Sequence, residues 1–271
     1  MQKIVVTDVD GTLLDAKNQL SEFTLEVLHA LVAKGVHIVL ASSRGHENMK
    51  TFYDQIGSES PMICYNGTFS VEDPHQMPSF ITYEEVFYKP MNEIVELCSG
   101  LLVQYCFYSI HDWYAPRMDK WVKQEAEVLG TKPVIFNKEE FFYDWKKCLM
   151  HPIFKMTCMG EKEAIDKLYE KTAVYGELYH RYRTGDHHLE LVSRRSDKWL
   201  AFEEAADFLD IDPKDSIAFG DGYNDIRLLS EAGVSVAVAN ARPELYEIAD
   251  FYTARHDEDG VAKFLQKHYK L

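Results

Sequence analysis

Short apolar runs alternate with amphipathic segments over the first quarter of the chain, and this pattern predicts alternating strands and helices. Buried strands are expected at residues 4–7, 36–40 and 61–65, and helices at residues 21–33 and 47–56. Ser21 can cap the first helix, and Lys34-Gly35 is a suitable end for it. Strand–helix–strand repeats of this kind predict a parallel sheet with right-handed crossovers.

The same alternation returns near the C-terminus. Helices are expected at residues 197–209, 224–232, 243–248 and 260–268, and strands at residues 216–219, 234–238 and 251–253. These units have the same strand–helix rhythm as those at the start of the chain. Both ends of the chain are therefore expected to build one sheet.

The middle of the chain is richer in aromatic residues and has fewer glycine-punctuated units. It carries probable helices at residues 91–101, 118–129 and 162–171, and strand-like runs at residues 103–110, 153–159 and 177–183. We expect an α/β protein with a Rossmann-like parallel sheet core built from residues 1–82 and 186–271. An α+β domain, residues 83–185, is expected as an insert in that core.

Composition adds limits on the class of protein. The chain has 271 residues, of which 46% are hydrophobic, so it can form one large domain or two of ordinary size. No stretch of about 18 apolar residues occurs, so no membrane span is expected. The N-terminus has no leader-like segment, which favours a cytoplasmic protein. Five scattered cysteines without a Cys-x-x-Cys spacing predict small core residues, not a disulfide framework or a zinc site.

The charge balance bears on possible partners. The sequence has 44 acidic and 29 basic residues, which gives a formal net charge of −15. Such a surface repels nucleic acid and anionic lipid, so neither is an expected partner. It would also repel a phosphorylated metabolite. An anionic substrate therefore requires a local positive group.

Two carboxylates follow the first predicted strand at once. Asp8 and Asp10 are separated by one residue, and Gly11 turns the chain after them. Like charges so close together repel, and a divalent cation between them would remove that cost. The alternative is an acidic turn after a strand, because Asp-Gly is a common turn pair.

A second acidic cluster lies at residues 220–225, after the predicted strand at 216–219. A helix cap needs only one acidic residue, whereas this cluster contains Asp221, Asn224 and Asp225. A helix cap without further function remains the alternative interpretation. Strand ends in a parallel sheet share one edge. Asp221 and Asp225 are therefore expected beside Asp8 and Asp10, in an all-oxygen pocket suited to Mg²⁺.

Two weaker signals accompany the acidic clusters. Ser42 follows the second predicted strand and could donate a hydroxyl to a phosphate, although a serine pair at such a place is usually only a turn. Lys198 opens a predicted helix and could supply the positive charge, although most such lysines are solvated. Arg194 and Arg195 compete for that role.

These motifs occur in the order Asp-x-Asp-Gly-Thr, serine, lysine, Gly-Asp-Gly-x-Asn-Asp, and in this order they resemble the haloacid dehalogenase superfamily. Within it, the chain is similar to the Cof-like, sugar-phosphatase-type hydrolases. Tyr65-Asn66-Gly67 resembles the Asn-Gly turn of that subfamily. Its C-terminal signature is matched by Asn240-Ala241, Ala249-Asp250 and Asp259-Gly260-Val261.

The resemblance implies a role for each motif. Asp8 would be the nucleophile, and Asp10 the general acid and then the base. Ser42 and Lys198 would hold the phosphoryl group. The metal ligands would be Asp8, Asp221 and Asp225, together with Asp10 through its backbone carbonyl, and Mg²⁺ would be the cofactor. Contacts with the substrate are expected from Ser43, Arg44, Asn66, Gly67 and Asn224.

The resemblance also implies a haloacid dehalogenase-like core with a cap domain and a hydrolase acting on small phosphorylated metabolites, sugar phosphates above all. The family usually has Thr-Gly-Arg where this chain has Ser42-Ser43-Arg44, and a Cβ at Ser43 matters if that residue needs a positive φ. A phosphomannomutase-like phosphotransferase and a non-catalytic phosphometabolite-binding protein are the alternatives. We expect a monomer or a weak homodimer.

Overall fold

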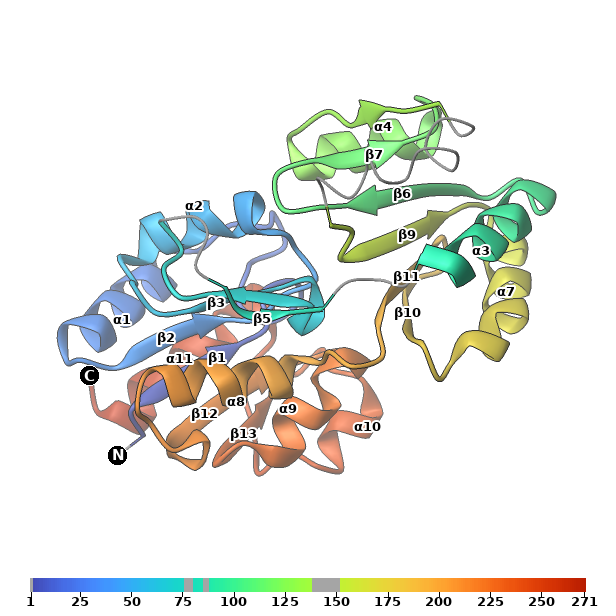
Figure 1. Ribbon diagram of the computed structural model, residues 1–271. Coiled ribbons are helices and arrows are strands. Elements are labelled where there is room, and N and C mark those ends of the chain that lie inside the picture. Colours follow the sequence, from blue (N-terminus) through green and yellow to red (C-terminus); the bar gives the residue numbers. More distant parts are fainter. Residues whose placement is uncertain (1, 76–79, 85–87, 138–151) are drawn as a thin grey trace. The chain divides into compact units, whose positions relative to one another are not determined.

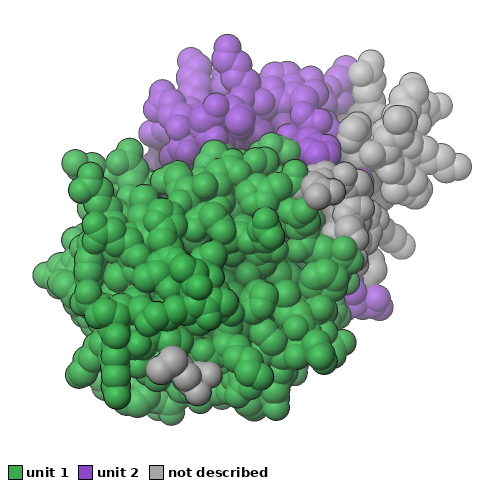
Figure 2. Space-filling model, turned by 90° about the vertical axis from the view of Figure 1, so that its left-hand side faces the viewer, with its two compact units in different colours: residues 1–83, 197–271 green, residues 84–196 purple. Residues whose placement is uncertain are grey.

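The computed structural model describes residues 2–75, 80–84, 88–137 and 152–271. It divides into two compact units. The first contains residues 1–83 and 197–271, and the second contains residues 84–196 (Figure 2). The first unit is thus built from both ends of the chain, and each unit is described below by itself.

A five-stranded parallel sheet forms the centre of the first unit (Figure 1). Its order is β14-β13-β12-β1-β2. The strands are β1 Ile4–Thr7, β2 His37–Leu40, β12 Ser216–Gly220, β13 Val234–Ala237 and β14 Phe251–Tyr252. In register, Ile4 lies opposite both His37 and Ser216. The N-terminal strand is therefore central, and the predicted α/β class with a parallel sheet is confirmed.

Helices flank this sheet in two packed groups. The helices are α1 Glu22–Ala33, α2 His46–Ile56, α8 Lys198–Phe208, α9 Ile226–Glu231, α10 Pro243–Tyr246 and α11 Gly260–Tyr269. Helix α1 packs against α2 and α11, and α9 packs against α8 and α10. The predicted cap of α1 is present, because the Ser21 hydroxyl accepts a hydrogen bond from the backbone N–H of Thr24. Strands β1 and β12 are fully buried between their neighbours, and β2 is buried from Ile38 to Leu40.

The strand expected at residues 61–65 belongs to another sheet. A small antiparallel sheet contains β3 Met62–Cys64, β4 Phe69–Val71 and β5 Phe80–Tyr83. A single bridge, Ala41 with Ile63, links β3 to the segment after β2. The turn at Tyr65–Gly67 reverses the chain after β3, and this reversal explains why the strand pairs with β4 rather than extending the parallel sheet.

The second unit is built on a six-stranded sheet of order β10-β11-β9-β6-β7-β8. Its strands are β6 Gln104–Tyr108, β7 Trp113–Ala115, β8 Val134–Ile135, β9 Lys155–Met159, β10 Tyr179–Gly185 and β11 His188–Ser193. Its helices are α3 Tyr88–Gly100, α4 Lys120–Leu129 and α7 Lys162–Lys171. Residues of α3 and α7 share an apolar core with Tyr105, Phe107 and Leu189 of the sheet.

Strand β11 was not expected from the sequence, and it shifts the boundary between the two units. The predicted core resumed at residue 186, whereas the second unit continues to residue 196. The reason is that β11 pairs with β9 on one side and β10 on the other. His187 and His188 therefore lie in the second unit, where the Nδ1 atom of His187 bonds to the carbonyl of Gly160.

The remaining elements of the described chain are short. Short 3₁₀ helices lie at Tyr65–Gly67, Thr172–Tyr175, Pro213–Asp215, Tyr223–Asp225 and His256–Glu258. The described cysteines, Cys64, Cys98, Cys106 and Cys158, are buried and unpaired, and Cys148 lies outside the described residues. In the described part of the chain, we find no helix with the length and apolar character needed to cross a bilayer.

Candidate active site

The predicted site residues lie where strands of the first unit end. Asp8 follows β1, Ser42 follows β2 after one residue, and Asp221 follows β12 directly. These three strands are neighbours in the sheet and run in the same direction, so their carboxyl ends share an edge. The parallel topology therefore brings together residues that are more than 200 positions apart in sequence.

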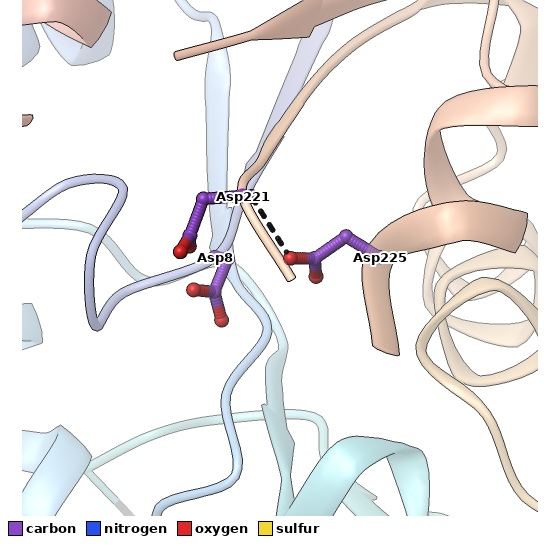
Figure 3. Close-up of side chains that lie close together, drawn as sticks. All are labelled: Asp8, Asp221 and Asp225. Carbon is purple, nitrogen blue, oxygen red and sulfur yellow. Dashed lines mark hydrogen bonds between the residues drawn. The ribbon is translucent and has the colours of Figure 1, made fainter. Parts of the chain in front are cut away.

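Three carboxylates converge at this edge (Figure 3). One oxygen from each of Asp8, Asp221 and Asp225 lies within 4.8 Å of the others. The second oxygen of Asp225, Oδ2, accepts hydrogen bonds from the backbone N–H groups of Asp221, at 3.1 Å, and Gly222, at 3.0 Å. The side chain of Asp225 thus shapes the loop that carries Asp221.

Residues after β1 hold Asp221 from the other side. The hydroxyl of Thr12 donates to Asp221 Oδ1 at 2.7 Å. Gly11 has a φ of +79°, and a Cβ there would lie 2.7 Å from Asp221 Oδ2. Only glycine fits this position, because it tolerates both the left-handed backbone and the close approach of the carboxylate. The sequence predicts a turn at Gly11 but not the contact of Thr12 with Asp221.

Lys198 enters the acidic cluster from the first turn of α8. Its side chain is fully buried. The ammonium group donates to Asp8 and, at 2.7 Å, to Asp225 Oδ1. Asp197 caps the helix by accepting from the backbone N–H of Leu200. Lys198 is therefore the residue that supplies positive charge here, whereas Arg194 bonds to His180 in the second unit.

The acidic groups of the cluster outnumber its positive charge. Burial raises the pKa of Asp8 well above its ordinary value, and Asp225 and Asp221 add to this effect, while Lys198 opposes it. Burial and Asp225 also raise the pKa of Asp221, against the hydrogen bond from Thr12. Although burial acts to lower it, the pKa of Lys198 stays above its ordinary value because of Asp225 and Asp8. Three carboxylates thus face a single ammonium group.

This donor set fits a hard divalent cation. Carboxylate oxygens are the ligands that Mg²⁺ prefers, and a cation would offset the charge that Lys198 leaves uncompensated. The residues that could hold it are Asp8, Asp221 and Asp225. The chemistry of the donors and their charge excess therefore suit the predicted cofactor.

Asp10 lies outside this cluster, contrary to the expectation that four carboxylates would share one pocket. Its two oxygens accept hydrogen bonds from Arg44, at 2.8 Å from Nε and 2.6 Å from Nη2. This is a bidentate ion pair, the strongest geometry for a carboxylate and a guanidinium. Arg44, which was expected to contact substrate, has its charged group paired with Asp10 in this structure.

Ser42 is buried, and its hydroxyl accepts a hydrogen bond from the backbone N–H of Arg44 at 3.1 Å. Its neighbour Ser43 does not have a positive φ. The side chain that this sequence carries in place of the usual glycine therefore causes no backbone strain of the kind that the sequence analysis considered.

Asn66 and Asn224, both expected to bind substrate, contact each other. The Nδ2 atom of Asn224 donates to Oδ1 of Asn66 at 2.8 Å. Gly67 lies so close to α8 that a Cβ would be 2.2 Å from the carbonyl oxygen of Asp197. Asn240 of the C-terminal signature donates to the carbonyl of Gly11 at 2.7 Å, a support that the sequence did not predict.

Known proteins of similar sequence show the family of this chain. The sequence profile of the haloacid dehalogenase-like hydrolases matches residues 5–265. The chain belongs to that family. The predictions of the family and of a hydrolase are confirmed by this match.

Related proteins of this family align over nearly their whole length. The chain is 27% identical to the phosphatase YwpJ of Bacillus subtilis, with 97% of this chain and 99% of the relative covered. It is 24% identical to the 5-amino-6-(5-phospho-D-ribitylamino)uracil phosphatase YitU of the same organism, with coverages of 99% and 98%. A haloacid dehalogenase-like hydrolase from Bacteroides thetaiotaomicron has the same fold, with a TM-score of 0.85, 24% identity and coverages of 99% and 100%.

Proposed function

We propose that the protein is a Mg²⁺-dependent phosphatase that hydrolyses small phosphate monoesters through an aspartyl-phosphate on Asp8. The observation that carries the proposal is the cluster of Asp8, Asp221 and Asp225 around the ammonium group of Lys198. A carboxylate is a poor nucleophile toward a phosphate dianion in water, because both carry negative charge. A site that fixes positive charge beside the carboxylate removes this obstacle.

In the first step, a carboxylate oxygen of Asp8 attacks phosphorus while the bond from phosphorus to the leaving-group oxygen breaks. Asp10, which carries a proton on one carboxylate oxygen while the other still accepts from Arg44, gives this proton to the leaving-group oxygen. In the second step, water attacks phosphorus, the bond to Asp8 breaks, and Asp10 takes the proton from water. Lys198 and the Ser42 hydroxyl hold phosphoryl oxygens throughout. Asp8, Asp221 and Asp225 would hold Mg²⁺, which would neutralise negative charge on the nucleophile and the phosphate.

We propose small phosphorylated metabolites as substrates, with sugar phosphates favoured. YitU, a relative that aligns over 98% of its length, is named for a phosphorylated ribityl compound, and this supports a substrate with a polyhydroxyl group next to phosphate. In this proposal residues 84–196 act as the cap that selects the leaving group. No role is proposed for nucleic acid or membranes.

A phosphate-release screen tests the proposal. Sugar phosphates, nucleotides and cofactor phosphates are each incubated with the protein, with and without Mg²⁺. We expect release of phosphate from several sugar phosphates in the presence of Mg²⁺ only. Binding without release would contradict a catalytic role. Isomerised hexose phosphate formed from hexose 1-phosphate and glucose 1,6-bisphosphate would instead indicate a phosphotransferase.

A further inference from the structure

The turn after β3 has a backbone that few sequences adopt. Tyr65, Asn66 and Gly67 follow one another with φ values of +46°, +60° and +88°. Asparagine and glycine enter this left-handed region at moderate or no cost, but an aromatic residue there is an outlier. Backbone strain of this kind persists only where surrounding contacts enforce it, and it concentrates at functional sites.

Asn66 carries a second cost. Its side chain is 1% exposed, and its Nδ2 atom is buried without a hydrogen-bond partner. A buried donor that makes no hydrogen bond destabilises a fold, and glycine would avoid both costs at this position. Stability alone therefore does not explain an asparagine here.

The contacts of the turn offer an explanation. The backbone N–H groups of Tyr65 and Asn66 donate to the carbonyls of Arg44, at 3.0 Å, and Ser42, at 2.8 Å. The Oδ1 atom of Asn66 accepts from Asn224 at 2.8 Å. The turn thus contacts the loop after β2 and the loop after β12, although β3 belongs to neither strand's sheet.

The loop after β12 is also held at Asp221 by Thr12 and Arg242 and at Asp225 by Lys198, whereas the bond from Asn66 reaches it at Asn224. It contains Asp221, Asn224 and Asp225, and its internal hydrogen bonds run from the N–H groups of Asp221 and Gly222 to Asp225 Oδ2. Asn224 lies in the same short 3₁₀ turn as Asp225. A bond that fixes Asn224 therefore also limits where the carboxylates of Asp225 and Asp221 can lie.

We propose that Asn66 is a positioning residue, which holds the loop of Asp221 and Asp225 in register with the loop of Ser42 through its bond to Asn224. This inference rests on the proposed function for its effect on turnover, but not for its effect on the loop. Asn66 acts through Asn224 and need not touch substrate. Displacement of catalytic groups by about 1 Å can cost about 100-fold in rate.

Asn66→Gly is the decisive variant, and Asn18→Gly is its matched control. Asn18 is exposed, has a φ of +57°, and donates from its backbone N–H only to Asp15 within its own loop. Both substitutions place glycine at a position with a positive φ, so their direct effects on the backbone are alike. We expect a thermal midpoint within roughly 3 °C of wild type for both variants.

The two variants should differ in the loop. By hydrogen exchange of the free protein, the amides of Asp221 and Gly222 should lose protection in Asn66→Gly and Asn224→Ala and keep it in Asn18→Gly. With a substrate, kcat should fall by about 10- to 100-fold in Asn66→Gly.

The outcomes separate the two proposals. Wild-type protection at Asp221 and Gly222 in Asn66→Gly would overturn the positioning role whatever the activity. If wild type releases no phosphate, the proposed function fails, while the exchange result still decides the role of Asn66. If Asn66→Gly does not fold, Asn224→Ala breaks the same bond from its other end and gives the deciding result.

Discussion

Replacement of Arg44 should separate substrates by their leaving group. In the proposed mechanism Asp10 protonates the leaving oxygen. In the structure Arg44 holds both oxygens of the Asp10 carboxylate, and it can keep one of these hydrogen bonds when Asp10 carries its proton. Arg44→Gln removes this fork. Arg44→Lys keeps the positive charge, but an ammonium group cannot form the two parallel hydrogen bonds of a guanidinium group. The loss of rate should therefore be intermediate.

The size of the effect follows from the geometry. Hydrogen bonds between charged groups each contribute roughly 1.5–3 kcal/mol, but the Asp10 side chain is 41% exposed and the Arg44 side chain 17% exposed. Solvent screening reduces the sum, which leaves about 1.5–3 kcal/mol for the pair. If that energy holds Asp10 in place, its loss corresponds to about 10- to 100-fold in rate.

The assay compares kcat/KM for an alkyl phosphate with that for p-nitrophenyl phosphate. The alkoxide must be protonated to leave, whereas p-nitrophenolate leaves without a proton. Arg44→Gln should therefore lower the rate with the alkyl phosphate by about 10- to 100-fold and the rate with p-nitrophenyl phosphate by roughly twofold or less. Equal losses for both substrates would refute the reasoning, because they would indicate a general disturbance. A thermal melt controls for the loss of the Arg44 contact over the Phe52 ring, now at 5.4 Å.

Four further predictions concern the acidic cluster and the turn beside it. Asp8→Asn should lower turnover by about 10⁴-fold or more and raise the melting temperature of the metal-free protein. Burial raises the pKa of Asp8, so the ionised carboxylate destabilises the folded protein at pH values above the ordinary pKa of 3.8. The increase in melting temperature from Asp8→Asn should therefore shrink as the pH falls toward 3.8. A lower melting temperature of Asp8→Asn at neutral pH would contradict this. Mg²⁺ at about 100 times its dissociation constant should raise the free energy of unfolding of wild type by about 2.7 kcal/mol. An equal increase in Asp221→Asn would show that Asp221 is not a metal ligand. Lys198→Met leaves two buried carboxylates without their ammonium partner and should destabilise the metal-free protein by about 3–5 kcal/mol, as measured by denaturant unfolding; wild-type stability would contradict the ion pairs. Gly67→Ala should cost about 2–5 kcal/mol, because its φ is +88° and its Cβ would meet the carbonyl of Asp197, and an unchanged midpoint would show that this contact is not tight.

The elements that the sequence predicted well are those with a strong local signal. The β-branched run at Ile4–Thr7 and the capped segment after Ser21 became β1 and α1, because buried parallel strands and helix starts have distinct compositions. Strands β4, β7 and β8 escaped notice because they contain only two or three residues each. Strand β11 was not predicted, and the domain boundary was placed before it at residue 186, because its pairing with β9 cannot be recognised from its own sequence.

The same distinction applies to the site. Asp8, Asp221, Asp225 and Lys198 could be predicted to meet, because chain order and strand ends determine where they lie. Which charged groups pair could not be predicted. The ion pair of Arg44 with Asp10 spans 34 residues and the bond of Asn224 to Asn66 spans 158 residues, and both depend on the folded backbone. Long-range partners of this kind have no local signature.

The central position of β1 has a consequence for the order in which the protein can fold. One edge of β1 pairs with β2, but the other pairs with β12, which is synthesised about 200 residues later. A nascent chain that ends before Ser216 therefore has an open strand edge at Ile4–Thr7, while residues 84–196 already contain a complete apolar core of their own. Contacts of such long sequence separation form slowly, and an unpaired apolar edge favours aggregation. We therefore expect the inserted unit to fold first during synthesis, and the catalytic sheet to close only after β12 has left the ribosome.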